Sequence, residues 1–159
     1  MQSSQVPFVH RRTPTWGETD GARIVYTVRF VDYAMDAIEG WFREVMQLDW
    51  FRMNTELDMG TPFVKIDMDI KSPLTPHDTL EVCVLVERMG RSSLTFNVVG
   101  KRNGEEISFE SRFICSMVRT STMRSISIPG PLRQNVNNYM AKCAELAQQS
   151  GLTATGHSM

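Results

Sequence analysis

The chain has 159 residues, of which 42% are hydrophobic and 22% are charged, and it carries 17 Lys and Arg against 18 Asp and Glu. A length close to the usual domain size predicts one domain over residues 1–159, with a core large enough to need no disulfide or metal. The net charge of −1 argues against nucleic acid or an anionic membrane surface as partners, because both require an excess of basic side chains.

The sequence predicts a cytoplasmic protein rather than an exported or membrane-inserted one. The N-terminal stretch MQSSQVPFVHRR lacks the apolar core of a signal peptide. No apolar stretch approaches the roughly 18–20 residues that are needed to cross a bilayer. Cys83, Cys115 and Cys143 are odd in number and have no CxxC spacing, which favours a reducing compartment.

The first predicted elements are a short strand over residues 7–15 and a long helix from Thr27 to about Leu48. Residues 1–5 are polar and are expected to be disordered. Within the helix, apolar residues recur at steps of three and four and predict a broad buried face. The residues assigned to this face are Val28, Val31, Ala34, Met35, Ile38, Trp41, Phe42 and Val45. Residues 49–62 are interpreted as a loop, in which Trp50 and Phe51 form either core or the wall of an acyl pocket.

Antiparallel strands are predicted to follow the helix. Residues 63–71 alternate between apolar and charged side chains, which is typical of a half-buried strand with one wet face. Further alternating runs cover 80–86, 94–98 and 107–117, and a shorter one covers 125–128. Asn103-Gly104 predicts a tight hairpin, because both turn positions favour a positive φ.

A C-terminal amphipathic helix is predicted over residues 132–147, after the break at Pro129-Gly130-Pro131. Residues 151–159 are small and polar and are expected to be disordered. Strands that follow a single helix indicate the α+β class rather than a doubly wound sheet. We therefore expect a curved antiparallel sheet of five or six strands wrapped around one long helix, with a second helix at the C-terminus.

The loop between the first strand and the long helix contains the residues best suited to chemistry. A carboxylate there lies near the free N–H groups and positive dipole end of a helix, which can polarise a carbonyl and stabilise an oxyanion. Asp20 would then act as nucleophile or as general base for water. The spacing alone favours the alternative that Glu18, Thr19 and Asp20 are ordinary turn and capping residues, because Asp and Thr are common in caps.

The run WGETDGARIVY, followed by Phe30-Val31-Asp32-Tyr33, resembles the signature of hotdog-fold acyl-CoA thioesterases of the 4-hydroxybenzoyl-CoA thioesterase type. The resemblance implies a curved sheet around a long helix. It also implies an acyl-CoA substrate that binds at subunit interfaces of a homodimer or homotetramer. No cofactor is implied, because CoA is part of the substrate.

The resemblance assigns the catalytic carboxylate to Asp20 and the carbonyl-polarising amide to Tyr26 or Thr27. Two positions depart from the family pattern. Gly21 stands where the family often has Pro, and Arg23 replaces the motif Gly. If that position requires a positive φ, Arg23 introduces about 1–2 kcal/mol of strain.

The resemblance also points to the turn around residues 87–94 as a contact for CoA. Arg88 and Arg91 supply charged donors for phosphate, and Ser92 and Ser93 supply hydroxyl groups. An ordinary basic surface turn is the alternative. The turn over 72–80 matches a family turn before a strand and is interpreted as structural.

Other chemistries lack their motifs. The three His residues have no metal-ligand spacing, so no metal is expected. There is no serine-hydrolase elbow, P-loop or dinucleotide fingerprint. Hotdog hydratases pair an Asp with a His five residues later, where this chain has Val25. Two alternatives to a thioesterase nevertheless stay open, namely a non-catalytic acyl-CoA-binding protein and an enoyl-CoA hydratase-like enzyme.

Overall fold

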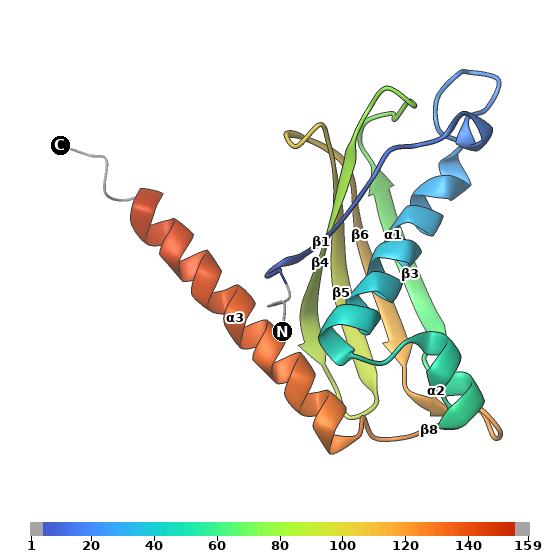
Figure 1. Ribbon diagram of the computed structural model, residues 1–159, viewed down its shortest axis with the longest axis vertical. Coiled ribbons are helices and arrows are strands. Elements are labelled where there is room, and N and C mark those ends of the chain that lie inside the picture. The colour runs from blue at the N-terminus through green and yellow to red at the C-terminus, as the bar shows by residue number, and fades with distance from the viewer. Residues whose placement is uncertain (1–4, 155–159) are drawn as a thin grey trace.

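A computed structural model describes residues 5–154 and shows a curved sheet folded around a long helix (Figure 1). The helical elements are η1 Trp16–Glu18, α1 Thr27–Trp41, the π-helical turn η2 Phe42–Met46, α2 Trp50–Glu56 and α3 Gly130–Ala154. The strands are β1 Phe8–Arg12, β2 Met59–Gly60, β3 Phe63–Ile70, β4 Leu80–Met89, β5 Ser93–Arg102, β6 Glu106–Ser116, β7 Val118–Arg119 and β8 Arg124–Ser125.

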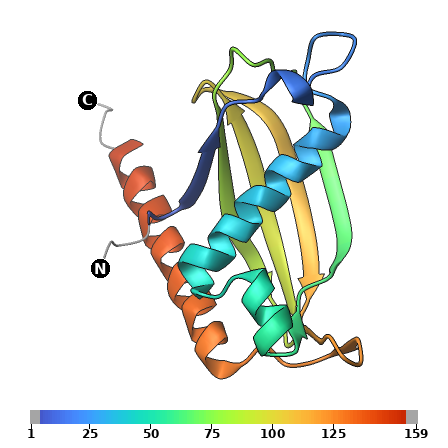
Figure 2. The same ribbon diagram turned by 45° about the vertical axis from the view of Figure 1, so that its right-hand side comes forward.

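The main sheet has five antiparallel strands in the order β1-β4-β5-β6-β3, and α1 crosses its concave face (Figure 2). A small second sheet has the order β2-β7-β8. This arrangement confirms the predicted α+β hotdog fold with a C-terminal helix. The segment 125–128, expected to be a strand, contributes only Ser125, and the predicted loop over 49–62 contains α2 and β2.

The buried face of α1 differs from the predicted one. Phe30, Tyr33 and Ala37 are buried, although the apolar periodicity did not include them in the buried face. Val28, which was assigned to the face, is 55% exposed. The reason is that the position of the sheet selects the face, and the aromatic rings of Phe30 and Tyr33 fill more of the concave surface than valines would.

Close packing and turn chemistry account for two glycine positions in the sheet. Asn103 and Gly104 have φ of 53° and 76°, which confirms the predicted hairpin turn between β5 and β6. Gly100 lies under the ring of Phe109 on the neighbouring strand, and a Cβ there would be 2.2 Å from a ring carbon. The sheet therefore needs a residue without a side chain at this point.

Strand β3 forms one edge of the sheet, and its apolar face stays exposed. Ile66 and Ile70 pair opposite the buried Phe113 and Phe109, so they share the face that α1 covers elsewhere. They are nevertheless 46% and 43% exposed. The predicted strand is thus confirmed, but in the single chain its apolar face is less buried than predicted, because α1 packs over β4 and β5 rather than over this edge.

Helix α3 packs through its first half beside β4. The Tyr139 hydroxyl accepts a hydrogen bond from the Phe8 amide at 2.9 Å and donates one to the Val84 carbonyl, so it links α3 to β1 and β4. The helix begins two residues earlier than predicted and continues to Ala154, into the segment expected to be disordered. The remaining residues of that expectation, 1–4 and 155–159, lie outside the described part of the chain.

Candidate active site

The loop that carries Asp20 is a small hairpin closed onto the start of α1. The Tyr26 amide donates to the Glu18 carbonyl at 2.9 Å, and the Asp20 amide donates to the Ile24 carbonyl at 3.0 Å. A second attachment runs from the Val25 amide to the Leu74 carbonyl at 2.8 Å. Backbone hydrogen bonds therefore hold Asp20 at a set position relative to the helix N-terminus.

The Asp20 carboxylate is exposed, and only one of its oxygens accepts a hydrogen bond from the described part of the chain. Its Oδ1 accepts a hydrogen bond from the Ala22 amide at 2.8 Å, which orients the side chain. Within the described residues, Oδ2 has no hydrogen-bond donor. One carboxylate oxygen is thus fixed by the loop, and the other is free to contact a substrate or a water molecule.

Arg23, which departs from the family pattern, meets the condition for backbone strain at this position. Arg23 has a φ of 65°, in the left-handed region that favours Gly. Its side chain is exposed, and the turn closes through the Arg23 amide, which donates to the Asp20 carbonyl at 3.0 Å. The loop thus keeps the conformation of a Gly-containing turn at a cost of about 1–2 kcal/mol.

The two candidate oxyanion donors differ in availability. The Tyr26 amide is already hydrogen-bonded to the Glu18 carbonyl, so it is not available to a ligand in this arrangement, and its assignment as a donor stays a prediction. Thr27 is the first residue of α1, where amides have no intrahelical acceptor. Its amide donates to no other described residue. Thr27 is therefore the candidate donor that the structure leaves free.

A cavity of about 210 Å³ lies beside this helix end. Thr27 and Phe30 of α1 line one side, and Ile70, Lys71 and Ser72 at the end of β3 line the other. The cavity thus borders Thr27 and the exposed edge of the sheet. It offers room for the reacting part of a substrate next to the positive end of the helix dipole.

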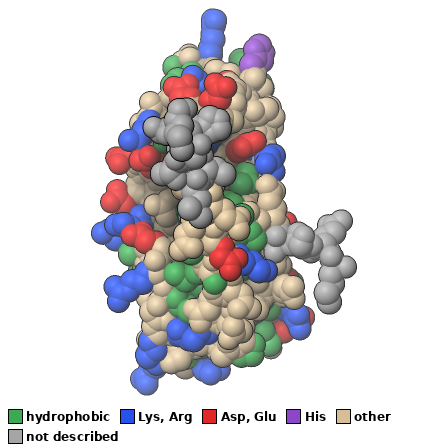
Figure 3. Space-filling view, turned by 90° about the vertical axis from the view of Figure 1, so that its left-hand side faces the viewer, with side chains coloured by type: hydrophobic (Ala, Val, Ile, Leu, Met, Phe, Trp, Pro, Cys, Tyr) green, Lys and Arg blue, Asp and Glu red, His purple; other side chains and the backbone are tan. Residues whose placement is uncertain are grey.

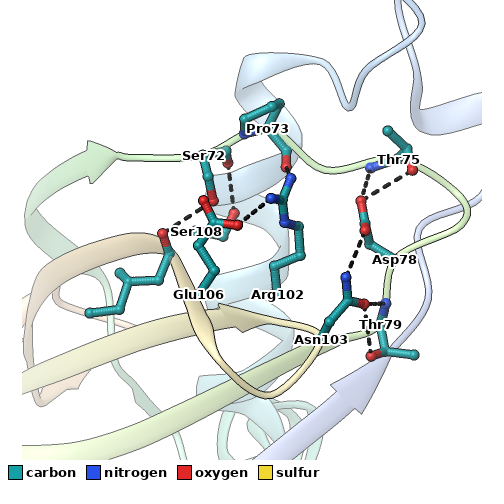
Figure 4. Close-up of polar contacts among 10 residues, drawn as sticks. Ser72, Pro73, Thr75, Asp78, Thr79, Arg102, Asn103, Glu106 and Ser108 are labelled. Atoms are coloured by element: carbon teal, nitrogen blue, oxygen red, sulfur yellow. Dashed lines mark hydrogen bonds and ion pairs between the residues drawn. The ribbon is translucent and has the colours of Figure 1, made fainter.

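The turn over 72–80 supports the site rather than reacting in it (Figure 4). Asp78 accepts hydrogen bonds from the Thr75 amide at 2.8 Å and from Asn103 Nδ2 at 2.9 Å. Partial burial opposes ionisation of Asp78, but these hydrogen bonds outweigh it and hold the pKa of Asp78 below its usual value. Both oxygens of this carboxylate accept hydrogen bonds, which agrees with the prediction that this turn has a structural role.

The predicted CoA-binding turn does not meet Asp20 within one chain. Arg88 lies near the end of β4, whose ten residues place it roughly 30 Å from the start of the strand beside the Asp20 loop. Arg91 donates to Ser127 Oγ at 2.8 Å, next to the start of α3, and Ser92 and Ser93 follow in the same turn. On the face that carries α3, basic side chains gather toward this lower end (Figure 3).

A larger cavity of about 350 Å³ lies at the opposite end of α1 from Asp20. Its lining is mainly apolar and includes Met35, Trp50, Phe63 and Met123. Trp50 was one of the two residues considered as an acyl-pocket wall, whereas its neighbour Phe51 is 79% exposed and lines neither cavity. The small β2-β7-β8 sheet, which the sequence did not predict, supplies Gly60 and Val118 to this wall.

Asp58 secures the wall of the larger cavity, and no sequence motif marked it. Its carboxylate accepts hydrogen bonds from Thr120 Oγ1 at 2.6 Å, from the Ser121 amide at 2.8 Å and from Ser121 Oγ at 2.6 Å. These hydrogen bonds lower the pKa of Asp58 to about 2. Asp58 thereby attaches the turn between β7 and β8 to the segment that follows α2.

Two kinds of feature are absent from the described residues. Residues 5–154 contain no group of three or more His, Cys, Asp and Glu side chains placed to hold a metal ion. None of the helices in this range has the length and apolar character to cross a membrane.

The sequence of the chain is similar to those of known proteins. The model of the thioesterase-like superfamily matches residues 14–136. A 1,4-dihydroxy-2-naphthoyl-CoA hydrolase from Prochlorococcus marinus (strain NATL2A) is 27% identical over 103 residues, which cover 61% of this chain and 66%, just under two thirds, of the relative.

Solved structures show the same fold. A thioesterase superfamily protein from Jannaschia sp. CCS1 is 34% identical, with a TM-score of 0.78 over 87% of this chain and 96% of that one. A thioesterase from Thermus thermophilus, solved with coenzyme A and zinc, is 19% identical, with a TM-score of 0.74 over 85% of this chain and 95% of that one. Together, the match over residues 14–136 and the Jannaschia structure show that the chain belongs to the thioesterase-like superfamily.

Proposed function

We propose that the protein hydrolyses the thioester of an acyl-CoA to a free carboxylic acid and CoA. The observation that carries the proposal is the Asp20 carboxylate, held with one free oxygen in a loop closed onto the free Thr27 amide of α1. The name of the Prochlorococcus relative and the coenzyme A bound to the Thermus protein support a CoA thioester as the substrate.

In the proposed reaction, Thr27 donates its amide to the thioester carbonyl oxygen and stabilises the negative charge that develops there. Asp20 either attacks the carbonyl carbon itself, giving an anhydride that water hydrolyses, or removes a proton from the attacking water. In both routes the C–S bond breaks, and the CoA thiolate leaves and takes up a proton. The proposed reaction uses no metal and no redox cofactor.

We further propose that a second copy of the chain completes the site, in a homodimer or a homotetramer. Within the described residues, β3 has a strand partner only on its β6 side and exposes Val64, Ile66 and Ile70. Such an edge invites pairing with another strand. Two copies related by a two-fold axis perpendicular to the strands would pair β3 antiparallel, because such an axis reverses the strand direction.

Antiparallel pairing of β3 would bring the Ile70 end of one copy beside the Phe63 end of the other. The 210 Å³ cavity at Thr27 would then adjoin the partner's 350 Å³ apolar cavity, and we propose that this larger cavity holds the acyl group. The turn with Arg88 and Arg91 would reach the CoA phosphates from the partner. Three unpaired cysteines favour a reducing compartment such as the cytoplasm for this enzyme.

The test is thiol release from short, long and aromatic acyl-CoAs by the native protein and by Asp20→Asn, with the fold of both checked by circular dichroism. We expect release by the native protein and a loss of at least about 100-fold in Asp20→Asn. Unchanged hydrolysis in the variant would remove Asp20 from the mechanism. Tight CoA-ester binding without free thiol would indicate a binding protein, and water addition to an enoyl-CoA without thiol release would indicate a hydratase.

A further inference from the structure

The side chain of Glu18, which the proposed reaction does not use, connects the Asp20 loop to β1. Its Oε1 accepts a hydrogen bond from Arg12 Nη2 at 2.5 Å, and its Oε2 accepts one from the Thr15 amide at 2.6 Å. The backbone carbonyl of the same residue accepts the Tyr26 amide. Glu18 therefore joins β1, the loop and the N-terminus of α1 through a single residue.

Tyr33 extends this cluster into the body of α1. The guanidinium carbon of Arg12 lies 4.2 Å from the centre of the Tyr33 ring, and Arg12 also pairs with Asp36 at 3.3 Å. The Tyr33 hydroxyl is fully buried and interacts with the Glu18 carboxylate, although it lacks the geometry of a full hydrogen bond. Burial, and then the neighbouring Glu18, raise the pKa of Tyr33, so its hydroxyl keeps its proton.

Glu18 is ionised at neutral pH although its side chain is only 15% exposed. Burial opposes its ionisation, but hydrogen bonds from Thr15, the polar contact with the Tyr33 hydroxyl and the charge of Arg12 outweigh it and lower its pKa. A partly buried ion pair with hydrogen bonds on both carboxylate oxygens has little freedom to move. Loss of one partner leaves the other charge uncompensated.

We propose that Glu18 is a positioning residue, whose carboxylate, held by Arg12 and Thr15, sets the placement of Asp20 against the first amides of α1. The inference rests on the proposed thioesterase function. Asp20 follows Glu18 by two residues in the hairpin that Glu18 and Tyr26 close, so a shift of Glu18 moves the reacting carboxylate relative to the helix. A misplacement of about 1 Å can lower a rate by about 100-fold.

The variant Glu18→Gln keeps the size of the side chain but removes its charge. We expect kcat for thiol release to fall at least about tenfold while KM stays within about twofold, because the substrate contacts are intact and the reacting geometry is not. Arg12→Ala should give the same pattern. The double variant should lose no more than the larger single loss, because both changes release the same anchor.

The matched control is Glu81→Gln, which removes an exposed ion pair with Arg11 between β1 and β4. Its kcat and KM should equal those of the native protein. Tyr33→Phe removes only a hydroxyl and provides a milder test should Glu18→Gln fail to fold. We expect it to lower kcat by less than Glu18→Gln does, again with KM unchanged.

Hydrogen exchange gives a measurement that does not depend on activity. The hydrogen-bonded amides of Asp20 and Tyr26 should exchange faster in Glu18→Gln and Tyr33→Phe than in the native protein and in Glu81→Gln. An unchanged kcat in these variants, or losses that multiply in the double variant, would overturn the positioning role. A native protein that releases no thiol would overturn the proposed function instead, and the exchange rates alone would then decide whether Glu18 holds the loop.

Discussion

The amide of Tyr26 donates to the carbonyl of Glu18 at 2.9 Å, immediately before the first turn of α1. This hydrogen bond satisfies the Tyr26 amide and leaves Thr27 as the first amide of the helix that is free to bind a ligand. The distance between Asp20 and the helix end is thus set by backbone closure. Changes that strain or relax this loop should therefore alter stability and reactivity together.

Arg23→Gly should stabilise the protein by about 1 kcal/mol, because Gly adopts the φ of 65° without the steric cost that Arg23 bears. For a chain of this size, that gain corresponds to an increase of roughly 2–4 °C in the thermal midpoint. Arg23→Ala is the control, since its Cβ keeps the strain, and it should show no gain. Equal midpoints for the Gly and Ala variants would contradict the account of strain.

Asp58→Asn should lower the thermal midpoint at neutral pH, because the ionised carboxylate accepts three hydrogen bonds from Thr120 and Ser121. The folded pKa of about 2 lies below the ordinary 3.8. The stabilisation is therefore complete above pH 3.8 and is lost as the pH falls through about 2.

Thermal melts across this pH range test the linkage. The difference in thermal midpoint between the native protein and Asp58→Asn should shrink as the pH falls below 3.8. Asp69→Asn changes an exposed carboxylate on β3, and its thermal midpoint should vary with pH as that of the native protein does. A difference that is the same at neutral pH and at about pH 2 would show that the charge of Asp58 contributes nothing.

Gly100→Ala should destabilise the protein by about 1–3 kcal/mol, because the added Cβ would lie 2.2 Å from the ring of Phe109, which is fully buried and has little room to move. Urea unfolding measures the change. Gly17→Ala serves as the comparison, since a Cβ at Gly17 meets nothing within 4 Å. A Gly100→Ala protein as stable as the native one would mean that the sheet can shift at this position.

Arg91→Ala should raise KM for an acyl-CoA about fivefold, which corresponds to about 1 kcal/mol for an exposed charge contact with phosphate. The value of kcat should change little, because this contact is equally strong in the ground and transition states. An acyl thioester of N-acetylcysteamine, which has no phosphate, should show the same KM with both proteins. A parallel rise in KM for both substrates would exclude a phosphate contact.

Ile66→Lys should weaken the proposed homodimer, because it places a charge in the exposed apolar face of β3. Sedimentation velocity at several concentrations should show a smaller mass than for the native protein, together with reduced thiol release. Leu85→Lys, on β4 and away from this edge, should keep the native mass. A native protein that sediments as a monomer at all concentrations would contradict the shared site.

Local chemistry was enough to predict most of the elements and the Asp20 loop. The period of apolar residues located α1, β3 to β6 and α3, since this period depends only on backbone geometry. The Asn103-Gly104 turn followed from the steric preferences of these two residues, whereas a positive φ at Arg23 was raised only by the resemblance, whose motif has Gly at this position. The position of Asp20 before a helix N-terminus was likewise a matter of sequence order.

Only the tertiary structure decided which surfaces meet. The buried face of α1 includes Phe30 and Tyr33, because the position of the sheet selects which side of the helix is covered. Ile66 and Ile70 remain exposed, because α1 does not cover the edge of the sheet on which they lie. The turn with Arg91 lies at the far end of the sheet from Asp20, although both resemble parts of one family site. Such distances depend on strand order and on closure of the chain through backbone hydrogen bonds, and no local pattern of residues encodes them.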